Sequence, residues 1–279
     1  MSYIRTALLL GVLTGILLTI GWVWQGMTGM TIFLVIAFAI NFLAYWFSDK
    51  IVLAMYRAKP LQKSDEPKLH KAIESLSKEM GIPKPKVYFV NLPVPNAFAT
   101  GRNYKNAAIA VTAGLLKNLN DEEIEGVISH ELSHVKNRDT LISTIAATIA
   151  GAIAYIAQIA WYSLFLGSGR RQGGSLIFLP LIVLAPMAAM LIQLAITRTR
   201  EFAADKTGAI ISKKPLALAS ALEKISKISK QHPIAGNDAT AHLFIVNPFK
   251  GDVLMNLFST HPPVEARVSK LREIAKELK

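Results

Sequence analysis

Two histidines and a glutamate near the middle of the chain have the spacing of a zinc-binding helix. His130 and His134 are four residues apart, and Glu131 follows the first of them directly. On an α-helix, side chains four residues apart lie one above the other, with Cβ atoms about 5–6 Å apart. Two such imidazoles can bind one zinc ion at about 2.0–2.1 Å. Glu131, roughly 100° further around the helix, would reach a water molecule on the metal and act as a general base.

The alternative is a pair of surface histidines on an ordinary helix. The predicted helix begins after Asn120, with acidic residues in its first turn, and runs to about Asn137. Its apolar residues recur on one face, namely Ile124, Val127, Ile128 and Val135. A buried helix favours a metal site, because histidines and carboxylates are costly to bury without partners.

Four long apolar segments place this helix next to a membrane. Of the 279 residues, 52% are hydrophobic and 18% are charged, whereas about 25% charged residues is usual in a soluble domain. The excess falls into four uncharged runs, at roughly residues 7–24, 29–48, 141–166 and 176–197. Each run approaches or exceeds the length of about 20 residues that crosses a hydrocarbon core as a helix.

These runs predict a mainly α integral membrane protein with four transmembrane helices. Residues 1–48 and 141–197 would form two transmembrane hairpins. Residues 49–140 and 198–279 would form the two parts of one α+β, zincin-like catalytic domain, and the second part would supply the third zinc ligand. The sequence Gln25–Thr28 is the expected turn of the first hairpin.

The distribution of positive charge predicts the orientation in the membrane. The formal net charge is +12, and residues 49–140 and 197–279 hold 14 lysines and arginines each. Positive residues collect on the cytoplasmic side of membrane proteins. We therefore expect a multi-pass protein of the cell membrane with a cytoplasmic catalytic domain, in contact with the lipid bilayer and with no nucleic acid. Cysteine is absent, which excludes thiol nucleophiles and zinc sites built from cysteine.

A catalytic zinc site needs a third protein ligand and leaves its fourth position to water. Glu201 directly follows the last apolar run, whereas the histidine pair precedes the third. An out-and-back hairpin would return the chain to the same membrane face, so we expect Glu201 to be this ligand. Asp205, one helical turn later, would hold a ligand imidazole through its other nitrogen. The alternative is that both carboxylates pair with neighbouring cations at a solvated helix end, namely Arg198, Arg200 or Lys206.

The first polar region also predicts a small antiparallel sheet. Lys86–Asn91 and Ala107–Thr112 are rich in residues that favour strands. Between them lie Asn96–Thr100 and a turn-like sequence that begins at Gly101. A helix is expected earlier, from about Ser64 to Gly81.

Three motifs together resemble the HtpX family of membrane zinc endopeptidases. They are His130–Asp139, Glu201–Asp205 and Ala241–Phe249, and the similarity extends over essentially the whole chain. The family belongs to the gluzincins and is related to the CAAX prenyl endoproteases. The resemblance implies an inner-membrane protease with a cytoplasmic active site that cleaves proteins or peptides, membrane proteins among them, in protein quality control. It also implies one Zn²⁺ per chain, bound by His130, His134 and Glu201, with Glu131 as the catalytic base.

The resemblance implies a substrate-binding strand as well. The sequence Asn96-Ala97-Phe98-Ala99 is similar to the family's strand beside the active site. Such an exposed strand can pair with an extended substrate backbone and read no particular sequence. Asn96 would also help to hold the oxyanion. The alternative is that Asn96 caps a turn after Pro95.

A second oxyanion donor is expected near the end of the chain. His261 and Arg267 lie in a segment that resembles the family's C-terminal motif, in which the histidine donates to the tetrahedral intermediate. Read without the resemblance, His261 is a loop residue before two prolines and Arg267 is a solvated helix charge.

The residues alone support a zinc hydrolase at a membrane surface, and the resemblance selects peptide bonds as its substrate. One alternative is a membrane chaperone with a structural zinc site, for which His242 would be the fourth ligand. Another is a small transporter. The transporter is disfavoured because the four apolar runs contain no charged residue, whereas transport pathways usually place ionisable groups at membrane depth.

Overall fold

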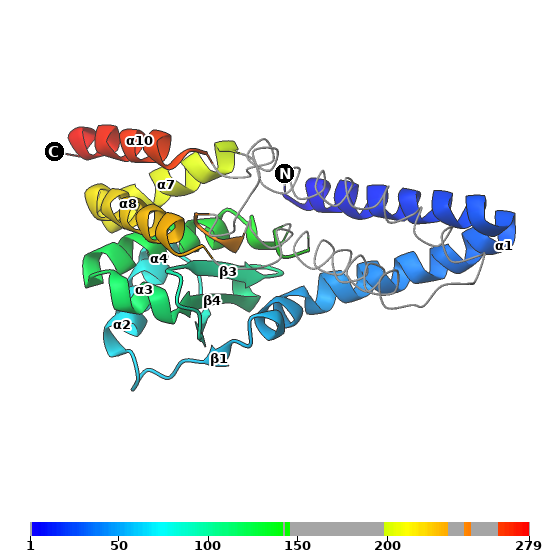
Figure 1. Cartoon of the computed structure of the whole chain (residues 1–279), viewed down its shortest axis with the longest axis horizontal. Helices are drawn as coiled ribbons and strands as arrows, with labels where there is room; N and C mark the ends of the chain where they lie inside the picture. The colour runs from blue at the N-terminus through cyan, green and yellow to red at the C-terminus, as the bar shows by residue number, and fades with distance from the viewer. Residues whose placement is uncertain (1, 142, 146–197, 234–242, 247–261, 279) are drawn as a thin grey trace.

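The computed structural model describes residues 2–141, 143–145, 198–233, 243–246 and 262–278. The predicted third and fourth transmembrane helices lie outside these residues, except for residues 141 and 143–145 at the start of the third, and His242 and His261 also lie outside. The elements treated below belong to the first hairpin and to both parts of the predicted catalytic domain (Figure 1).

Helix α1 (Ser2–Met55) consists of two limbs that join at a sharp reversal (Figure 1). The helical geometry breaks at Gln25 and at Gly26, where φ is +58°, a conformation that glycine adopts without steric cost. The reversal falls at the predicted turn. Across the two limbs, Asn41 Nδ2 donates a hydrogen bond of 2.9 Å to Thr14 Oγ1.

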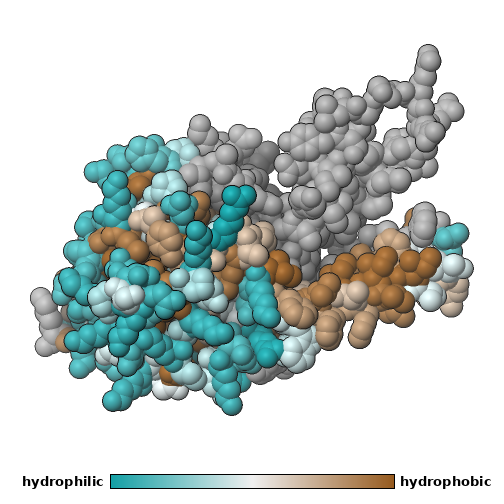
Figure 2. All heavy atoms as spheres, turned by 90° about the horizontal axis from the view of Figure 1, so that it is seen from below, coloured by the Kyte–Doolittle hydropathy of each residue, from teal (hydrophilic) through white to brown (hydrophobic). Residues whose placement is uncertain are grey.

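The second limb, Gln25–Met55, is long and apolar enough to cross a membrane. Among the residues that the structure describes, it is the one helix that meets both criteria. Most of its large apolar side chains before Ser48 point outward, as Phe38 does with 73% of its surface exposed. They form the hydrophobic arm of Figure 2. The described residues thus provide one candidate span, and the prediction of four is not established.

The remaining described elements form a sheet with helices packed against it. In chain order they are β1 (Lys59–Pro60), α2 (Pro67–Met80), β2 (Lys86–Val90), β3 (Ala97–Gly101), the short 3₁₀ helix η1 (Tyr104–Asn106), β4 (Ala107–Thr112), α3 (Ala113–Asn118), α4 (Asp121–Lys136), α7 (Arg198–Ser212), α8 (Pro215–Gln231) and α10 (Val264–Glu277). The predicted helix before the sheet is confirmed as α2.

The sheet is mixed, so the prediction of an antiparallel sheet was wrong. The strand order is β1-β2-β4-β3. Strand β4 runs antiparallel to β3 but parallel to β2. The reason is that the chain crosses from β2 to the outer edge, forms β3, and then folds back between the two. All six residues of β4 are buried, as is usual for a strand covered on both faces.

Helix α4 is the central helix of the domain. It packs against α2, α7, α8 and the edge strand β3. A capping box fixes its start, with Glu123 N–H donating to Asn120 Oδ1 at 2.9 Å and Asn120 N–H donating to Glu123 Oε2 at 3.0 Å. Ile128 and Leu132 are fully buried in the core beside the sheet. The predicted helix and its start at Asn120 are confirmed.

The end of α1 is packed into the same domain. Val52 and Leu53 are buried in a second apolar cluster, together with Phe98 and Ala110 from the sheet. The ring of Tyr56 also lies 5.4 Å from that of Phe98, measured between centroids. The apolar helix is therefore joined directly to the strand that lies beside α4.

Candidate metal centre

Three potential ligand side chains meet between α4 and α7. His130 and His134 come from α4, and Glu201 lies in the first turn of α7. One ligand atom from each of them lies within 4.8 Å of the other two. The two Nε2 atoms are 3.2 Å apart. Glu201 Oε2 lies 3.6 Å from His130 Nε2, and Glu201 Oε1 lies 3.5 Å from His134 Nε2.

These separations fit a zinc ion. Two ligand atoms that lie 2.0–2.1 Å from one tetrahedral ion are about 3.3–3.4 Å from each other. The observed values of 3.2, 3.5 and 3.6 Å are close to that distance, and the two Nε2 atoms face different oxygens of the Glu201 carboxylate. Two imidazoles and one carboxylate are also a usual ligand set of a catalytic zinc site. The predicted group of His130, His134 and Glu201 is therefore brought together, and it could hold the metal.

A close crossing of α4 and α7 positions Glu201 opposite the histidines. A Cβ atom on Gly208 would lie 3.0 Å from the backbone nitrogen of His130, so a larger residue would push the helices apart. Ser129 Oγ donates a hydrogen bond of 2.8 Å to the Gly208 carbonyl oxygen. Glu201 lies about two turns before Gly208 on α7. The crossing therefore determines how near its carboxylate comes to the ligand nitrogens.

Asp205 holds the other nitrogen of the first histidine, as predicted. Asp205 Oδ1 lies 2.9 Å from His130 Nδ1. Arg267 from α10 donates from Nε to Asp205 Oδ2 at 2.8 Å and from Nη2 to Oδ1 at 2.7 Å. Arg267 has no exposed surface, and Glu201 and Asp205 are also buried. The structure thus contradicts the alternatives of a solvated Arg267 and of carboxylates at a solvated helix end.

Arg267 keeps Asp205 ionised. Burial alone would raise the pKa of Asp205, but the charge and the hydrogen bonds of Arg267 outweigh burial and lower this pKa to about 2. A carboxylate at this position accepts the Nδ1 proton of His130, which leaves the Nε2 lone pair directed at the ligand group.

The second histidine has a carboxylate of its own. His134 Nδ1 lies 3.4 Å from Asp139 Oδ2, and Arg200 Nε lies 3.2 Å from Asp139 Oδ1. Burial alone would lower the pKa of His134, but the hydrogen bond to Asp139 and the charges of nearby glutamates raise it to about 9 in the protein without metal. Asp139 was not predicted from the sequence as a partner of His134. The available signal was a carboxylate five residues after the second histidine.

Glu131 lies beside the ligands and faces the edge strand. Its Oε2 accepts a hydrogen bond of 3.0 Å from the backbone N–H of Ala99 in β3. Burial raises the pKa of Glu131, against the opposing charges of His130 and His134. A buried carboxyl with a raised pKa next to a metal group is a candidate to accept and release a proton.

The predicted substrate-binding strand is the edge of the sheet, but the expectation that it is exposed was wrong, because all five residues of β3 are buried. Thr112 N–H donates to the Asn96 carbonyl oxygen at 3.0 Å, and the register continues with Phe98 opposite Ala110. Hydrogen-bonded pairs alternate along antiparallel strands. The backbone groups of Ala97 and Ala99 therefore point away from β4, toward the side of the strand that pairs with no other strand and faces α4. The N–H of Ala99 is the group that meets Glu131.

The side chain of Asn96 fastens a distant segment to this strand. Its Nδ2 donates to the carbonyl oxygen of Leu243 at 3.1 Å, and its Oδ1 accepts from Ile245 N–H at 2.9 Å. Arg267 Nη1 donates to the carbonyl oxygen of Ile245 at 3.2 Å. The amide of Asn96 thus bonds to this segment and not to a turn after Pro95. Its role toward an oxyanion stays a prediction.

A small cavity of about 50 Å³ opens beside the ligand group. Its wall combines the metal group with apolar and hydroxyl side chains, including Phe98, Leu243, Phe244, Thr140 and Ser143. About 10–15 Å³ of this volume is enough for one water molecule. In this conformation the cavity therefore admits a few water molecules but is too small to enclose a peptide. A peptide would have to displace part of the wall, of which Leu243–Ile245 forms one side.

Two histidines and a glutamate on crossed helices, with a second glutamate beside them, are the arrangement expected of a zinc peptidase. Residues 63–275 match Peptidase family M48. The chain therefore belongs to peptidase family M48, whose members are zinc-dependent. The resemblance to HtpX proteases found in the sequence is confirmed at the level of the whole chain by the relatives described next.

The chain is 54% identical over 280 residues to the Protease HtpX homolog of Pyrococcus furiosus, an alignment that covers 99% of this chain and 97% of the relative. It is 52% identical over 285 residues to the Protease HtpX homolog of Persephonella marina, in an alignment that covers 100% of this chain and 99% of that relative. Among solved structures it resembles S. mikatae Ste24p, with a TM-score of 0.51 and 19% identity. That match covers 97% of this chain and 65% of Ste24p. Because the sequence identity is only 19%, the match shows a shared fold alone.

Proposed function

We propose that the protein is a membrane-bound, zinc-dependent endopeptidase that hydrolyses peptide bonds of membrane or misfolded proteins. The observation that carries this proposal is the group of two Nε2 atoms and one carboxylate at zinc-like separations, with Glu131 next to it. Membership of peptidase family M48 supports the peptide bond as the target. The apolar second limb of α1 supports attachment to the membrane.

His130, His134 and Glu201 would hold the zinc ion, which would act as a Lewis acid toward the scissile carbonyl and lower the pKa of water. Glu131 would take a proton from the attacking water and pass it to the nitrogen of the leaving amine. The hydrogen bond from Ala99 N–H keeps its carboxylate directed between the ligands and β3. The raised pKa of Glu131 suits both the uptake and the release of this proton.

The edge of β3 would bind the substrate in an extended conformation once the groups that bury it are displaced. The residues of this site would be Asn96, Ala97, Phe98 and Ala99. The backbone groups of Ala97 and Ala99 point to the edge, and backbone pairing needs no particular side chain. A substrate aligned on Ala99 would lie next to Glu131, because the two are joined by a hydrogen bond. This geometry supports cleavage with broad sequence preference.

Two side chains are proposed to stabilise the oxyanion. His261 is one of them, on the resemblance of its motif. Asn96 is the other, although its amide bonds to Leu243 and Ile245 in this conformation. Asn96 could serve only if that segment moves when a peptide displaces the wall of the cavity. The loss of one such donor typically lowers the rate by about 10²–10³.

The location that fits these features is the cell inner membrane, with the catalytic domain on the cytoplasmic side. The charge distribution supports this orientation, because both polar parts of the chain are rich in lysine and arginine. A role in protein quality control rests on the resemblance to the HtpX family.

The test is proteolysis by the full chain purified in detergent. We expect it to digest casein, to lose this activity with a chelator, and to regain it with zinc. Glu131→Gln should retain zinc but not cleave, whereas His130→Ala should lose the metal. Turnover that is insensitive to chelation, or substantial turnover by protease-free Glu131→Gln, would refute the proposed function.

A further inference from the structure

Two aromatic rings on the exposed apolar surface of α1 have cations beside them. Trp46 and Phe47 end the nearly continuous series of exposed apolar side chains that begins at Ile32, with 46% and 39% of their surfaces exposed, and Met55 follows separately near the end of the helix. The guanidinium carbon of Arg102 lies 4.5 Å from the centre of the Trp46 ring, and Lys50 Nζ lies 5.4 Å from that of Phe47. Aromatic rings beside cations are typical of the level where hydrocarbon gives way to lipid headgroups.

Three elements bring positive charge to this level. Lys50 belongs to α1, and Arg102 follows β3. The guanidinium carbon of Arg138, just after α4, lies 5.6 Å from the ring of Tyr104 in η1. We call five cations of these segments the basic collar, namely Lys50, Arg102, Lys105, Lys136 and Arg138. Four of them are exposed, and Arg102 is half-buried.

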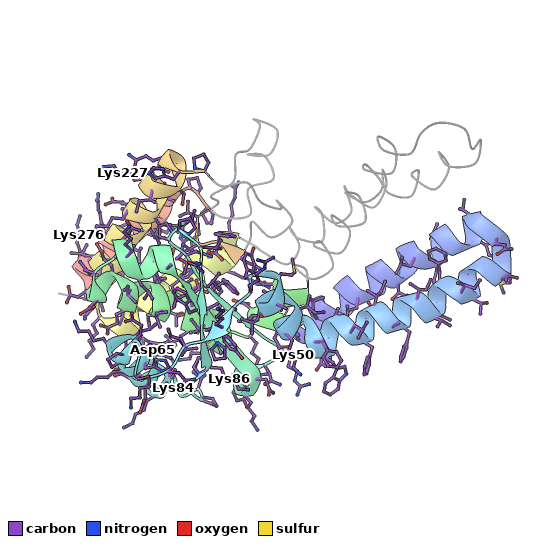
Figure 3. All side chains as sticks on the ribbon, turned by 60° about the horizontal axis from the view of Figure 1, so that its bottom comes forward. Lys50, Asp65, Lys84, Lys86, Lys227 and Lys276 are labelled. Carbon is purple, nitrogen blue, oxygen red and sulfur yellow. The ribbon has the colours of Figure 1, made fainter. Side chains whose placement is uncertain are left out.

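Within the described parts of these segments, acidic residues are fewer than the cations of the collar. They are Asp49 and Asp139, so these segments carry an excess of positive charge. Asp139 is buried and bonded to Arg200 and His134. In Figure 3, Lys50 lies where α1 joins the domain, whereas Lys227 and Lys276 lie at the far end. The collar is therefore a feature of the end of the domain that adjoins the apolar helix.

We propose that the basic collar binds the phosphate groups of anionic phospholipids and holds the β3–β4 hairpin at the bilayer surface. This inference rests on the proposed location of α1 in the membrane. Arginine matches phosphate with two parallel hydrogen bonds, and each lysine or arginine near an anionic leaflet adds about a fivefold gain in affinity. The occupant is a lipid headgroup rather than a free anion, because the collar borders an apolar surface.

The collar also relates the membrane surface to the catalytic centre. Ala99 is bonded to Glu131, and Arg102 follows three residues later along the same strand and its turn. At about 3.3 Å per residue, this places the headgroup level no more than about 10 Å along the chain from Ala99. The substrates within reach would be short extended segments next to a membrane span.

The experiment uses the full chain carrying Glu131→Gln, so that the protein does not digest itself. Hydrogen exchange of the backbone amides in residues 102–106 is measured in two kinds of nanodisc. One contains phosphatidylcholine alone, and the other contains equal parts of phosphatidylcholine and the anionic lipid phosphatidylglycerol. We expect the anionic lipid to slow this exchange several-fold. Added Arg102→Gln/Lys105→Gln should remove the difference, and Arg102→Lys/Lys105→Arg should retain it. The matched control Lys227→Gln/Lys276→Gln should also retain it.

Equal exchange rates in the two kinds of nanodisc would overturn the proposal. The proposal would also be overturned if the control variant lost the lipid effect as completely as Arg102→Gln/Lys105→Gln. Slow exchange in phosphatidylcholine nanodiscs with added inorganic phosphate would show that a free anion binds to the collar as well as a lipid headgroup does. That result would also overturn the proposal. Failure of the protein to enter either nanodisc is a different result. That outcome would refute the membrane location in the proposed function.

Discussion

Arg267 and Asp205 form a bidentate ion pair that is completely buried between α10 and α7. The two hydrogen bonds measure 2.8 and 2.7 Å, and the same carboxylate lies 2.9 Å from Nδ1 of His130. A helix near the end of the chain thus orients a ligand on α4. Since both charges are shielded from water, each depends on the other.

Removing the arginine should destabilise the protein strongly. Arg267→Met leaves the Asp205 carboxylate buried without its cation, which typically costs about 3–5 kcal/mol. We expect a large fall in the midpoint of thermal unfolding of the detergent-purified protein. Arg267→Met/Asp205→Asn should recover much of the loss, since the amide that replaces the carboxylate carries no charge. A double variant as unstable as the single one would show that the ion pair is not the cause.

Zinc affinity should depend on pH through His134. Its pKa of about 9 in the metal-free protein means that this imidazole is mostly protonated at neutral pH. Zinc binds the neutral imidazole, so binding must release the proton. We expect the apparent Kd in chelator-buffered zinc to fall as pH rises from 7, by up to about tenfold per unit, and to level off near pH 9. A Kd that is constant over this range would contradict the raised pKa.

The glycine at the helix crossing should be needed for the metal site. Gly208→Ala would place a methyl group 3.0 Å from the His130 backbone nitrogen, and the helices would have to separate. We expect weaker zinc binding, together with a loss of about 1–3 kcal/mol in stability from overpacking. Gly15→Ala is the control, because Gly15 is also helical but has nothing within 4 Å of an added Cβ. Unchanged zinc affinity in Gly208→Ala would rule out this role.

Asp139 and Arg200 should orient His134 as Asp205 and Arg267 orient His130. Loss of a carboxylate behind a zinc-bound histidine typically lowers metal affinity by about 10–100-fold. We expect this loss in Asp139→Ala and a smaller one in Arg200→Gln, both measured by competition with a zinc chelator. The control is Arg198→Gln, since Arg198 is exposed on the same helix. If Asp139→Ala bound zinc as tightly as the control, Asp139 would have no part in the site.

Local spacing made much of the site predictable. His130, Glu131 and His134 lie within one helical turn, and the capping box at Asn120 is also local. Glu201 could be inferred because the predicted hairpin of residues 141–197 would return the chain to the side where the histidine pair lies. The parallel pairing of β2 and β4 could not be inferred, since it depends on β3 crossing to the outer edge. The burial of Arg267 could not be inferred either. A charged residue on a helix is expected to be solvated unless its ion-pair partner is known, and the partner of Arg267 is Asp205, which is far away in the sequence.

Zinc-edge X-ray absorption of the purified Glu131→Gln protein tests the central claim most directly. We predict one zinc per chain with two imidazole nitrogens and oxygen ligands at about 2.0–2.2 Å. Glu201→Ala should bind zinc much more weakly. A shell with three or more imidazoles, or full zinc binding by Glu201→Ala, would contradict the proposed ligand set.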